Sequence, residues 1–154
     1  MNKTYFKILI FCFLAACGFT IVDQTQKGNF NIIDISSTGE TRINYKIKNE
    51  LLKNSNKNNE KIKISLESKK TKSIKEKNKK NEIKKYQLDV EVLVQAYKVK
   101  TNDIKKFTIV RSKDYNVSSR NSSTLQNEKD ALERLSGQIS EDILEKLFLE
   151  LNDN

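Results

Sequence analysis

The sequence predicts an α+β fold in which two helices pack on one face of a small four-stranded mixed sheet, as a two-layer sandwich. Two patterns carry this prediction. Residues 86–96 alternate between apolar and polar side chains, which is typical of a strand with one buried and one wet face. Residues 124–151 repeat apolar side chains at helical spacing. With the segments before them, they give the order strand, helix, three strands, long helix, which favours two packed layers.

A strand and a helix are predicted at the start of this domain. Apolar side chains alternate loosely over residues 30–35, and residues 36–39 end the strand. Ser37 and Glu40 have the spacing of a capping box, in which two side chains bond free backbone amides at the start of a helix. Apolar residues then recur every four positions and predict about three helical turns: Ile43, Ile47 and Leu51. Residues 53–60 are predicted to be a polar loop.

Three further strands follow, each predicted by a two-residue period. The second begins at Lys61, the third covers residues 86–97 and the fourth covers residues 107–112. The fourth is expected to continue through Tyr115 and Val117 after a local irregularity. Because the three are neighbours in the chain, we expect a meander. Their predicted inward-facing residues are Ile62, Ile64, Leu66, Tyr86, Leu88, Val90, Val92, Val94, Ala96, Phe107 and Ile109.

The last element is a helix over residues 124–151, and Ser123 with Gln126 suggests a second capping box at its start. At about 1.5 Å per residue this helix is roughly 40 Å long. One side carries an apolar stripe, predicted to face the core: Leu125, Leu132, Leu135, Ile139, Ile143, Leu147 and Leu151. The other side is charged and is predicted to face solvent or a partner: Glu128, Lys129, Glu133, Glu141 and Glu145.

The N-terminus has the pattern of a bacterial lipoprotein signal. An apolar run that follows Lys7 ends in Leu14-Ala15-Ala16-Cys17, and it is too short for the roughly 20 residues of a membrane span. Small side chains before the cysteine let a membrane-embedded peptidase grip the extended backbone and cut after Ala16. The Cys17 thiol then carries a diacylglyceryl group. The alternative is an ordinary secretory signal with an incidental cysteine.

This signal divides the chain into three parts. Residues 1–16 are the predicted signal peptide, residues 17–29 a lipidated tether, and residues 30–152 a single domain. Because Gly18 follows the cysteine in place of the aspartate associated with retention in the inner membrane, we expect an outer-membrane lipoprotein with a periplasm-facing anchor.

Composition excludes several kinds of chemistry. The chain has no histidine, and its other cysteine, Cys12, lies in the predicted signal. The mature chain therefore has no disulfide, thiol nucleophile or cysteine metal cluster. Glycine is too sparse for a phosphate-binding loop, and Asp89 with Glu91 fits the polar face of a strand. We expect no enzyme, cofactor or metal.

Positive charge is concentrated between residues 67 and 85, where nine lysines oppose three glutamates. One interpretation is a solvated, partly disordered loop. The other is a long hairpin with its tip near residues 78–81, whose ammonium groups meet phosphates. Since export leaves little contact with nucleic acid, the expected ligand is lipopolysaccharide or anionic lipid and not nucleic acid. The candidate contacts are Lys69, Lys70, Lys72, Lys79 and Lys80.

Several of these features together resemble the lipopolysaccharide-assembly lipoprotein family, LptE. They are the Cys17-Gly18-Phe19 start, the strand at residues 86–97 and the Tyr115-Asn116-Val117 segment. The terminal helix contributes Glu128, Ala131, Arg134, Leu135, Ile139, Ile143 and Leu147. The sequence lacks the proline that often follows Cys-Gly-Phe in the family, and its central hairpin is unusually rich in lysine.

The resemblance implies a non-enzymatic protein with two helices against a four-stranded sheet. It implies that the protein plugs the outer-membrane barrel LptD, assists the assembly of that barrel, and takes part in placing lipopolysaccharide in the outer leaflet. Two alternatives remain at this point. One is a lipoprotein that pilots another envelope machine, and the other is a small lipid-carrying domain with a cavity between sheet and helices.

Overall fold

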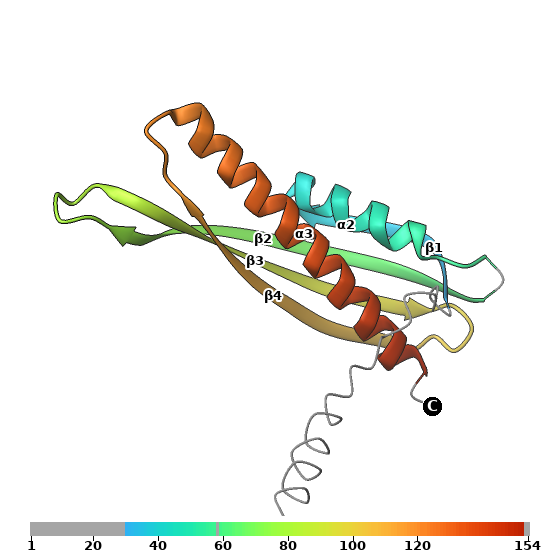
Figure 1. Ribbon diagram of the computed structural model, residues 1–154. Coiled ribbons are helices and arrows are strands. Elements are labelled where there is room, and N and C mark those ends of the chain that lie inside the picture. Colours follow the sequence, from blue (N-terminus) through green and yellow to red (C-terminus); the bar gives the residue numbers. More distant parts are fainter. Residues whose placement is uncertain (1–29, 58, 153–154) are drawn as a thin grey trace, which may run out of the picture.

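A computed structural model describes residues 30–57 and 59–152, so the predicted signal peptide, the tether and the lipid-attachment residue Cys17 lie outside the described residues. Figure 1 shows a sheet with both helices on one face. In chain order the elements are β1 (Phe30–Gly39), α2 (Thr41–Lys53), β2 (Glu60–Lys77), β3 (Ile83–Lys98), β4 (Ile104–Asn116) and α3 (Asn121–Asn152).

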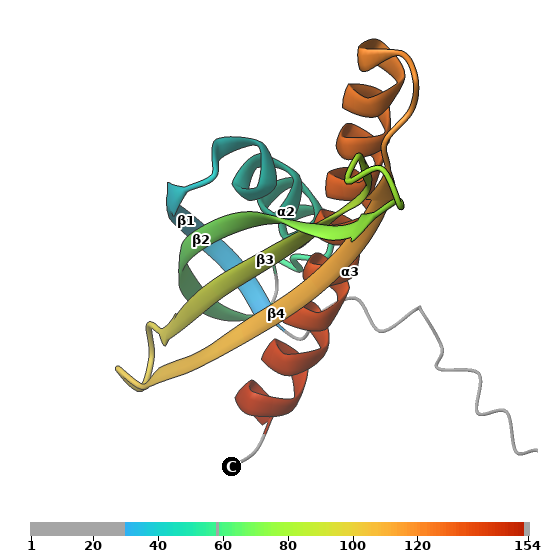
Figure 2. The same ribbon diagram turned by 90° about the vertical axis from the view of Figure 1, so that its left-hand side faces the viewer.

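The predicted fold class is confirmed. The four strands lie in the order β1-β2-β3-β4, with β1 parallel to β2 and the later pairs antiparallel, so the sheet is mixed. The parallel pair needs a crossover, which α2 supplies. The three later strands form the predicted meander. Figures 1 and 2 show that α2 and α3 cover the same face, which leaves the other face of the sheet open.

The core lies between the sheet and the two helices. Alternate residues of β2 and β3 point into it, from Ile62 to Leu66 and from Leu88 to Ala96. The helices contribute the predicted apolar residues, which are fully buried: Ile43, Ile47, Leu51, Leu135, Ile139, Ile143 and Leu147. Leu125 is the exception, at 59% exposed. Leu125 belongs to the first turns of α3. These turns extend beyond α2 (Figure 1).

A bulge explains the loose alternation of the first strand. Ile32 pairs with Ile62, and the next pair joins Asp34 to Lys63, so Ile33 is an extra residue in β1. The extra residue shifts the inward-facing positions by one, so Ile35 is buried and Ile33 is exposed. In β4, by contrast, the predicted irregularity is wrong. Its pairing with β3 is continuous, and the strand ends at Asn116, before Val117.

Both predicted capping boxes are wrong. Ser37 lies within β1, and Glu40, the residue that precedes α2, makes no side-chain cap bond. The backbone N–H of Glu40 instead donates to the Ser68 hydroxyl at 2.9 Å. At α3, the helix begins at Asn121, so Ser123 and Gln126 lie inside its first turns. The first box fails because β1 continues through Ser37 to Gly39. The second fails because α3 begins two residues before Ser123.

Candidate functional site

The segment from residue 67 to residue 85 is an ordered hairpin. It forms the far halves of β2 and β3, which pair from Glu67 with Leu93 to Lys77 with Ile83. The interpretation as a disordered loop is therefore wrong, and the predicted tip at residues 78–81 is confirmed. This hairpin extends beyond α2, and the start of α3 lies over the same end of the molecule (Figure 1).

The tip is built by the side chain of one asparagine. Asn78 Oδ1 accepts hydrogen bonds from the backbone N–H groups of Lys80 and Glu82, both at 2.9 Å. Its Nδ2 donates to the Glu82 carboxylate at 2.7 Å. That bond, followed by the contact with Lys84, lowers the pKa of Glu82. Asn81 takes the left-handed conformation, which asparagine tolerates well. The turn therefore presents Lys79 and Lys80 to solvent.

The structure separates the five candidate lysines into three groups. Lys79 and Lys80 are exposed at the tip, and Lys69 is exposed on the open face of the sheet. Lys70 and Lys72 lie on the face that carries the helices. Lys70 pairs with Glu40 at 3.5 Å and Lys72 with Glu128 at 2.7 Å. Of the five, Lys69, Lys79 and Lys80 have no ion-pair partner among the described residues and are free to meet a phosphate.

Lys72 belongs to a compact cluster that joins the hairpin, β4 and α3. Its ammonium group lies 4.3 Å from the ring centre of Tyr86 and 5.3 Å from that of Tyr115. The two rings stack with centres 5.6 Å apart. The Tyr115 hydroxyl donates to Glu128 Oε2 at 2.7 Å, the same oxygen that Lys72 contacts. Glu128 was predicted to lie on a solvated or partner-facing surface, and this prediction is wrong because the carboxylate joins α3 to the sheet.

Partial burial and hydrogen bonding set the charges of this cluster. Burial raises the pKa of Glu128, but hydrogen bonds from Lys72 and Tyr115 and the charges of nearby lysines outweigh it, so the pKa is lowered overall. Burial lowers the pKa of Lys72, but its contacts with Glu128 and Tyr115 raise that pKa by more, so the pKa is raised overall. Burial raises the pKa of Tyr115. Glu128 and Lys72 are both charged at neutral pH.

This cluster predicts a specific loss of stability in acid. Because folding lowers the pKa of Glu128, its contribution is present above the ordinary value of 4.5 and is lost as the pH falls through the folded value. Glu128→Gln should cost about 1–2 kcal/mol at pH 7. The variant and the wild type should converge as the pH falls below 4.5 and through the lowered pKa of folded Glu128. Urea unfolding at several pH values measures this.

The matched control is Glu133→Gln. Glu133 also lies on α3 and pairs with a lysine, Lys46, at 3.4 Å, but its side chain is 61% exposed. Solvent screens such a pair, so the control should change stability by less than about 0.5 kcal/mol. Equal losses in both variants would contradict the role assigned to the cluster.

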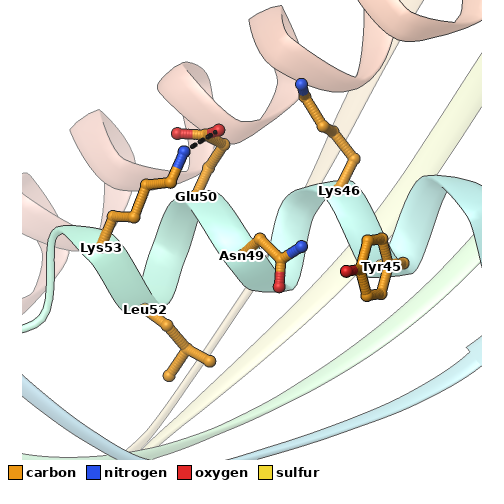
Figure 3. Close-up of a pocket in the computed structure, with 6 residues that line it drawn as sticks. All are labelled: Tyr45, Lys46, Asn49, Glu50, Leu52 and Lys53. Carbon is orange, nitrogen blue, oxygen red and sulfur yellow. Dashed lines mark hydrogen bonds and ion pairs between the residues drawn. The ribbon is translucent and has the colours of Figure 1, made fainter.

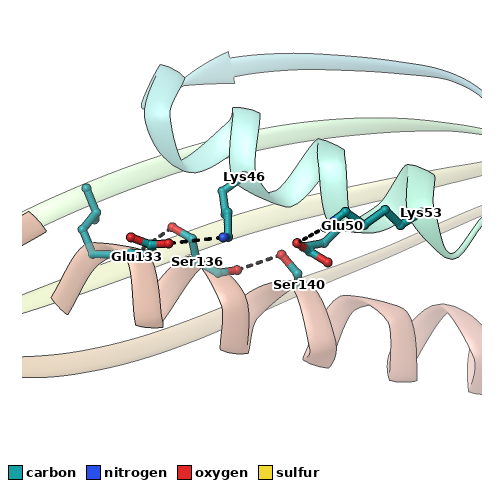
Figure 4. Close-up of polar contacts among 7 residues, drawn as sticks. Lys46, Glu50, Lys53, Glu133, Ser136 and Ser140 are labelled. Carbon is teal, nitrogen blue, oxygen red and sulfur yellow. Dashed lines mark hydrogen bonds and ion pairs between the residues drawn. The ribbon is translucent and has the colours of Figure 1, made fainter. Parts of the chain in front are cut away.

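Two small serines of α3 and the ion pair between Lys46 and Glu133 lie where α2 meets α3 (Figure 4). Ser136 donates its hydroxyl to Leu132 O at 2.8 Å, and Ser140 donates to Ser136 O at 2.7 Å. Both serines are buried. Their hydroxyls are thus used within α3, and their small size lets α2 lie close.

The outer side of α2 carries a shallow hollow of about 570 Å³ (Figure 3). Tyr45, Asn49 and Leu52 line it, together with the Glu50–Lys53 ion pair at 2.9 Å. Among the described residues, no three histidine, cysteine, aspartate or glutamate side chains gather where they could hold a metal ion. Within residues 30–57 and 59–152, no helix has the length and apolar character needed to cross a membrane.

Comparison with known proteins shows a likeness of fold. The sequence matches no protein-family model and no curated protein sequence. Rare lipoprotein B from Shewanella oneidensis superposes with a TM-score of 0.60 at 15% identity, covering 76% of this chain and 93% of that one. A putative lipoprotein from Caulobacter crescentus gives 0.58 at 15% identity, covering 78% and 92%. Lipoprotein B from Nitrosomonas europaea gives 0.52 at 14% identity, covering 88% and 97%.

The chain shares its fold with lipoproteins. The match covers more than nine-tenths of each of these three chains, so it extends over whole domains. At this level of identity the likeness concerns the arrangement of strands and helices only. The side chains of the Lys72 cluster and of the hairpin tip therefore have to be interpreted from this chain alone.

Proposed function

We propose that this protein is an outer-membrane lipoprotein that plugs the barrel LptD, assists its assembly, and takes part in lipopolysaccharide transport to the cell surface. The observation that carries the proposal is the fold, which matches whole lipoprotein domains. The Leu14-Ala15-Ala16-Cys17 pattern and the resemblance to LptE support the same function. Two or more acyl chains on Cys17 would give stable attachment, since each buried methylene contributes about 0.8 kcal/mol.

The open face of the sheet supports a plug. It exposes mainly polar side chains, among them Ser65, Glu67, Thr71, Thr108 and Ser112. Most apolar residues of the same strands point the other way, into the core, and the exceptions in β4 are Ile104 and Val110, which are 57% and 60% exposed. Such a surface matches the polar interior of a large barrel better than the hydrocarbon around it.

The proposal is tested by removing the anchor. A soluble form that begins at Gly18 should still form a stable one-to-one complex with LptD when the two are co-expressed, because the lipid raises local concentration and the domain makes the contacts. Purification of the tagged barrel, followed by measurement of the mass of the complex, gives the result. If the soluble form folds but never co-purifies, and the lipidated form follows membrane content only, the plug is rejected in favour of a piloting lipoprotein.

The free lysines of the hairpin are proposed to contact lipopolysaccharide phosphates. Replacing Lys69, Lys79 and Lys80 together by glutamine should lower the affinity of the domain for lipopolysaccharide and weaken its dependence on salt. Exposed charges within about 8–10 Å act collectively, so single changes should matter little. Binding is measured at two salt concentrations.

The control for this block removes the same charge at the other end of the domain. Lys61, Lys63 and Lys100 are also exposed, and within the described residues none of them has an ion-pair partner. Changing them to glutamine should leave the affinity within about twofold of the wild type. Equal losses in both triple variants would show that net charge, and not the hairpin, attracts the lipid.

The lipid-carrying alternative has less support. Fully buried side chains fill the layer between sheet and helices. The hollow between α2 and α3, lined by Tyr45 and Leu132 among others, holds about 130 Å³. Small-molecule pockets usually measure about 300–1,000 Å³. This hollow is therefore too small for a lipid chain.

A further inference from the structure

The strand β4 forms a long, regular edge of the sheet. Its pairing with β3 runs without a break from Ile104, opposite Tyr97, to Asn116, opposite Lys85. In the described part of the chain no strand pairs with its other side. At about 3.3 Å per residue, the 13 residues of β4 span roughly 43 Å. The backbone groups on that side therefore lack a strand partner along the whole of β4, and Figure 2 shows β4 as one border of the sheet.

The opposite edge, β1, is protected. It is interrupted by the bulge at Ile33, and side chains occupy several of its backbone groups. The Ile32 N–H donates to the Ser55 hydroxyl at 2.8 Å, and Asn44 Nδ2 donates to Thr38 O at 2.8 Å. Proteins usually protect edge strands in such ways. Within residues 30–57 and 59–152, the equivalent side-chain contact to the β4 backbone is made at its last residue, where Asn127 donates to Asn116 O at 2.9 Å.

A groove runs between β4 and α3, beside this open edge. It holds about 390 Å³, and its walls are residues 108–111 of β4 and a stretch of α3 that includes Glu145, Lys146 and Leu149. Leu149 on α3 is 56% exposed, and Val110, whose position in β4 alternates with the buried Ile109, is 60% exposed on the open face of the sheet. An edge strand with a helix beside it suits the addition of an extended peptide, whose backbone bonds to the strand and whose side chains enter the groove.

The charge of β4 indicates what kind of strand fits. Arg111 makes two hydrogen bonds to Asp142 at 2.6 and 2.7 Å, and Lys105 pairs with Glu150 at 3.7 Å. Lys106 and Lys113 have no carboxylate partner among the described residues. Like charges on neighbouring strands destabilise their pairing, whereas opposite charges stabilise it. Asp114, the one carboxylate of β4, also has no cationic partner among the described residues, so the two lysines leave a net positive charge that disfavours basic strands and favours an acidic one.

We propose that the open edge of β4 pairs with an extended, acidic segment of the barrel protein, which adds a strand to the sheet beside α3. This inference rests on the proposed function, because the barrel supplies the segment. Backbone hydrogen bonds give the contact its strength, and pairing of Lys106 and Lys113 with carboxylates selects the segment.

Charge reversal and hydrogen exchange test this proposal. In the co-expressed complex, the double variant Lys106→Glu with Lys113→Glu should bind the barrel at least tenfold more weakly than the wild type. The control, Lys57→Glu with Lys100→Glu, changes the net charge equally at two exposed turns outside the strands, and should bind within about twofold of the wild type. Circular dichroism checks that both variants fold.

Amide hydrogen exchange on the wild-type complex gives a readout that needs no variant. The alternate amides of β4 that do not bond to β3 should exchange at least tenfold more slowly in the complex than in the free domain, and those of β1 should not change. If the wild-type complex forms while β4 stays unprotected and the charge reversal binds normally, the strand addition is wrong and the barrel proposal stands. Failure of the wild type to bind the barrel rejects the proposed function itself. Protection of β4 in the free domain that rises with protein concentration would assign the edge to a second copy and overturn the inference.

Discussion

Gly39→Ala should cost the domain about 3 kcal/mol or more of folding free energy. Gly39 has a φ of 91°, a conformation that costs an alanine about 1–2 kcal/mol. A Cβ atom built there would lie 1.9 Å from the Ser68 carbonyl oxygen and 2.9 Å from its carbon, both backbone atoms of β2. Relief would require β1 to move away from β2, which breaks their pairing at the start of α2. Urea unfolding followed by circular dichroism measures the loss.

Gly137→Ala is the matched control for this change. Gly137 lies inside α3, and an added Cβ would meet nothing within 4 Å. Alanine favours a helix interior over glycine by about 0.5–1 kcal/mol, so this variant should be more stable than the wild type. Opposite shifts in the unfolding midpoint are therefore expected. A Gly39→Ala protein as stable as the wild type would show that β1 and β2 do not approach as described.

Leu135→Ala should destabilise the domain by about 2–5 kcal/mol, whereas Leu125→Ala should change its stability by less than about 0.5 kcal/mol. Both leucines belong to the apolar stripe of α3. Leu135 is fully buried between the layers, and Leu125 is 59% exposed. Removing buried atoms loses their transfer free energy and leaves a cavity. Removing exposed atoms does neither.

The two leucine variants are compared by thermal and urea unfolding under the same conditions. A loss at Leu125 as large as that at Leu135 would mean that the start of α3 is covered in the isolated domain. If Leu125→Ala leaves the stability unchanged but weakens the barrel complex, the start of α3 belongs to the binding surface.

The regular elements could be predicted because their patterns are local. A strand or helix with apolar residues along one side buries that side wherever it packs. The structure places the apolar sides of residues 86–97 and 132–151 in the core. The ends of the elements were less accurate. A strand continues as long as a neighbour pairs with it, so β2 runs to Lys77 because β3 supplies partners from Ile83 onward. The sequence alone left that segment open between a loop and a hairpin.

The helix starts and the charged groups depended on residues far apart in the sequence. The amide of Glu40 bonds to Ser68, 28 residues away, so the nearby capping pattern was misleading. Alternation along β2 does place Lys70 and Lys72 on the side of Leu66, and this signal could have separated them from Lys69. It could not have identified Glu40 and Glu128 as their partners.

The sequence by itself determined the fold class, the burial of the main apolar faces and the position of the hairpin tip, because all three follow from the spacing of side chains along one segment. The lipid on Cys17 and the contact with LptD stay predictions. Only the tertiary structure decided which lysines are paired, why Gly39 must be glycine, and which edge of the sheet is open. Each of these depends on the distance between atoms of different elements, and packing sets that distance after the elements have formed.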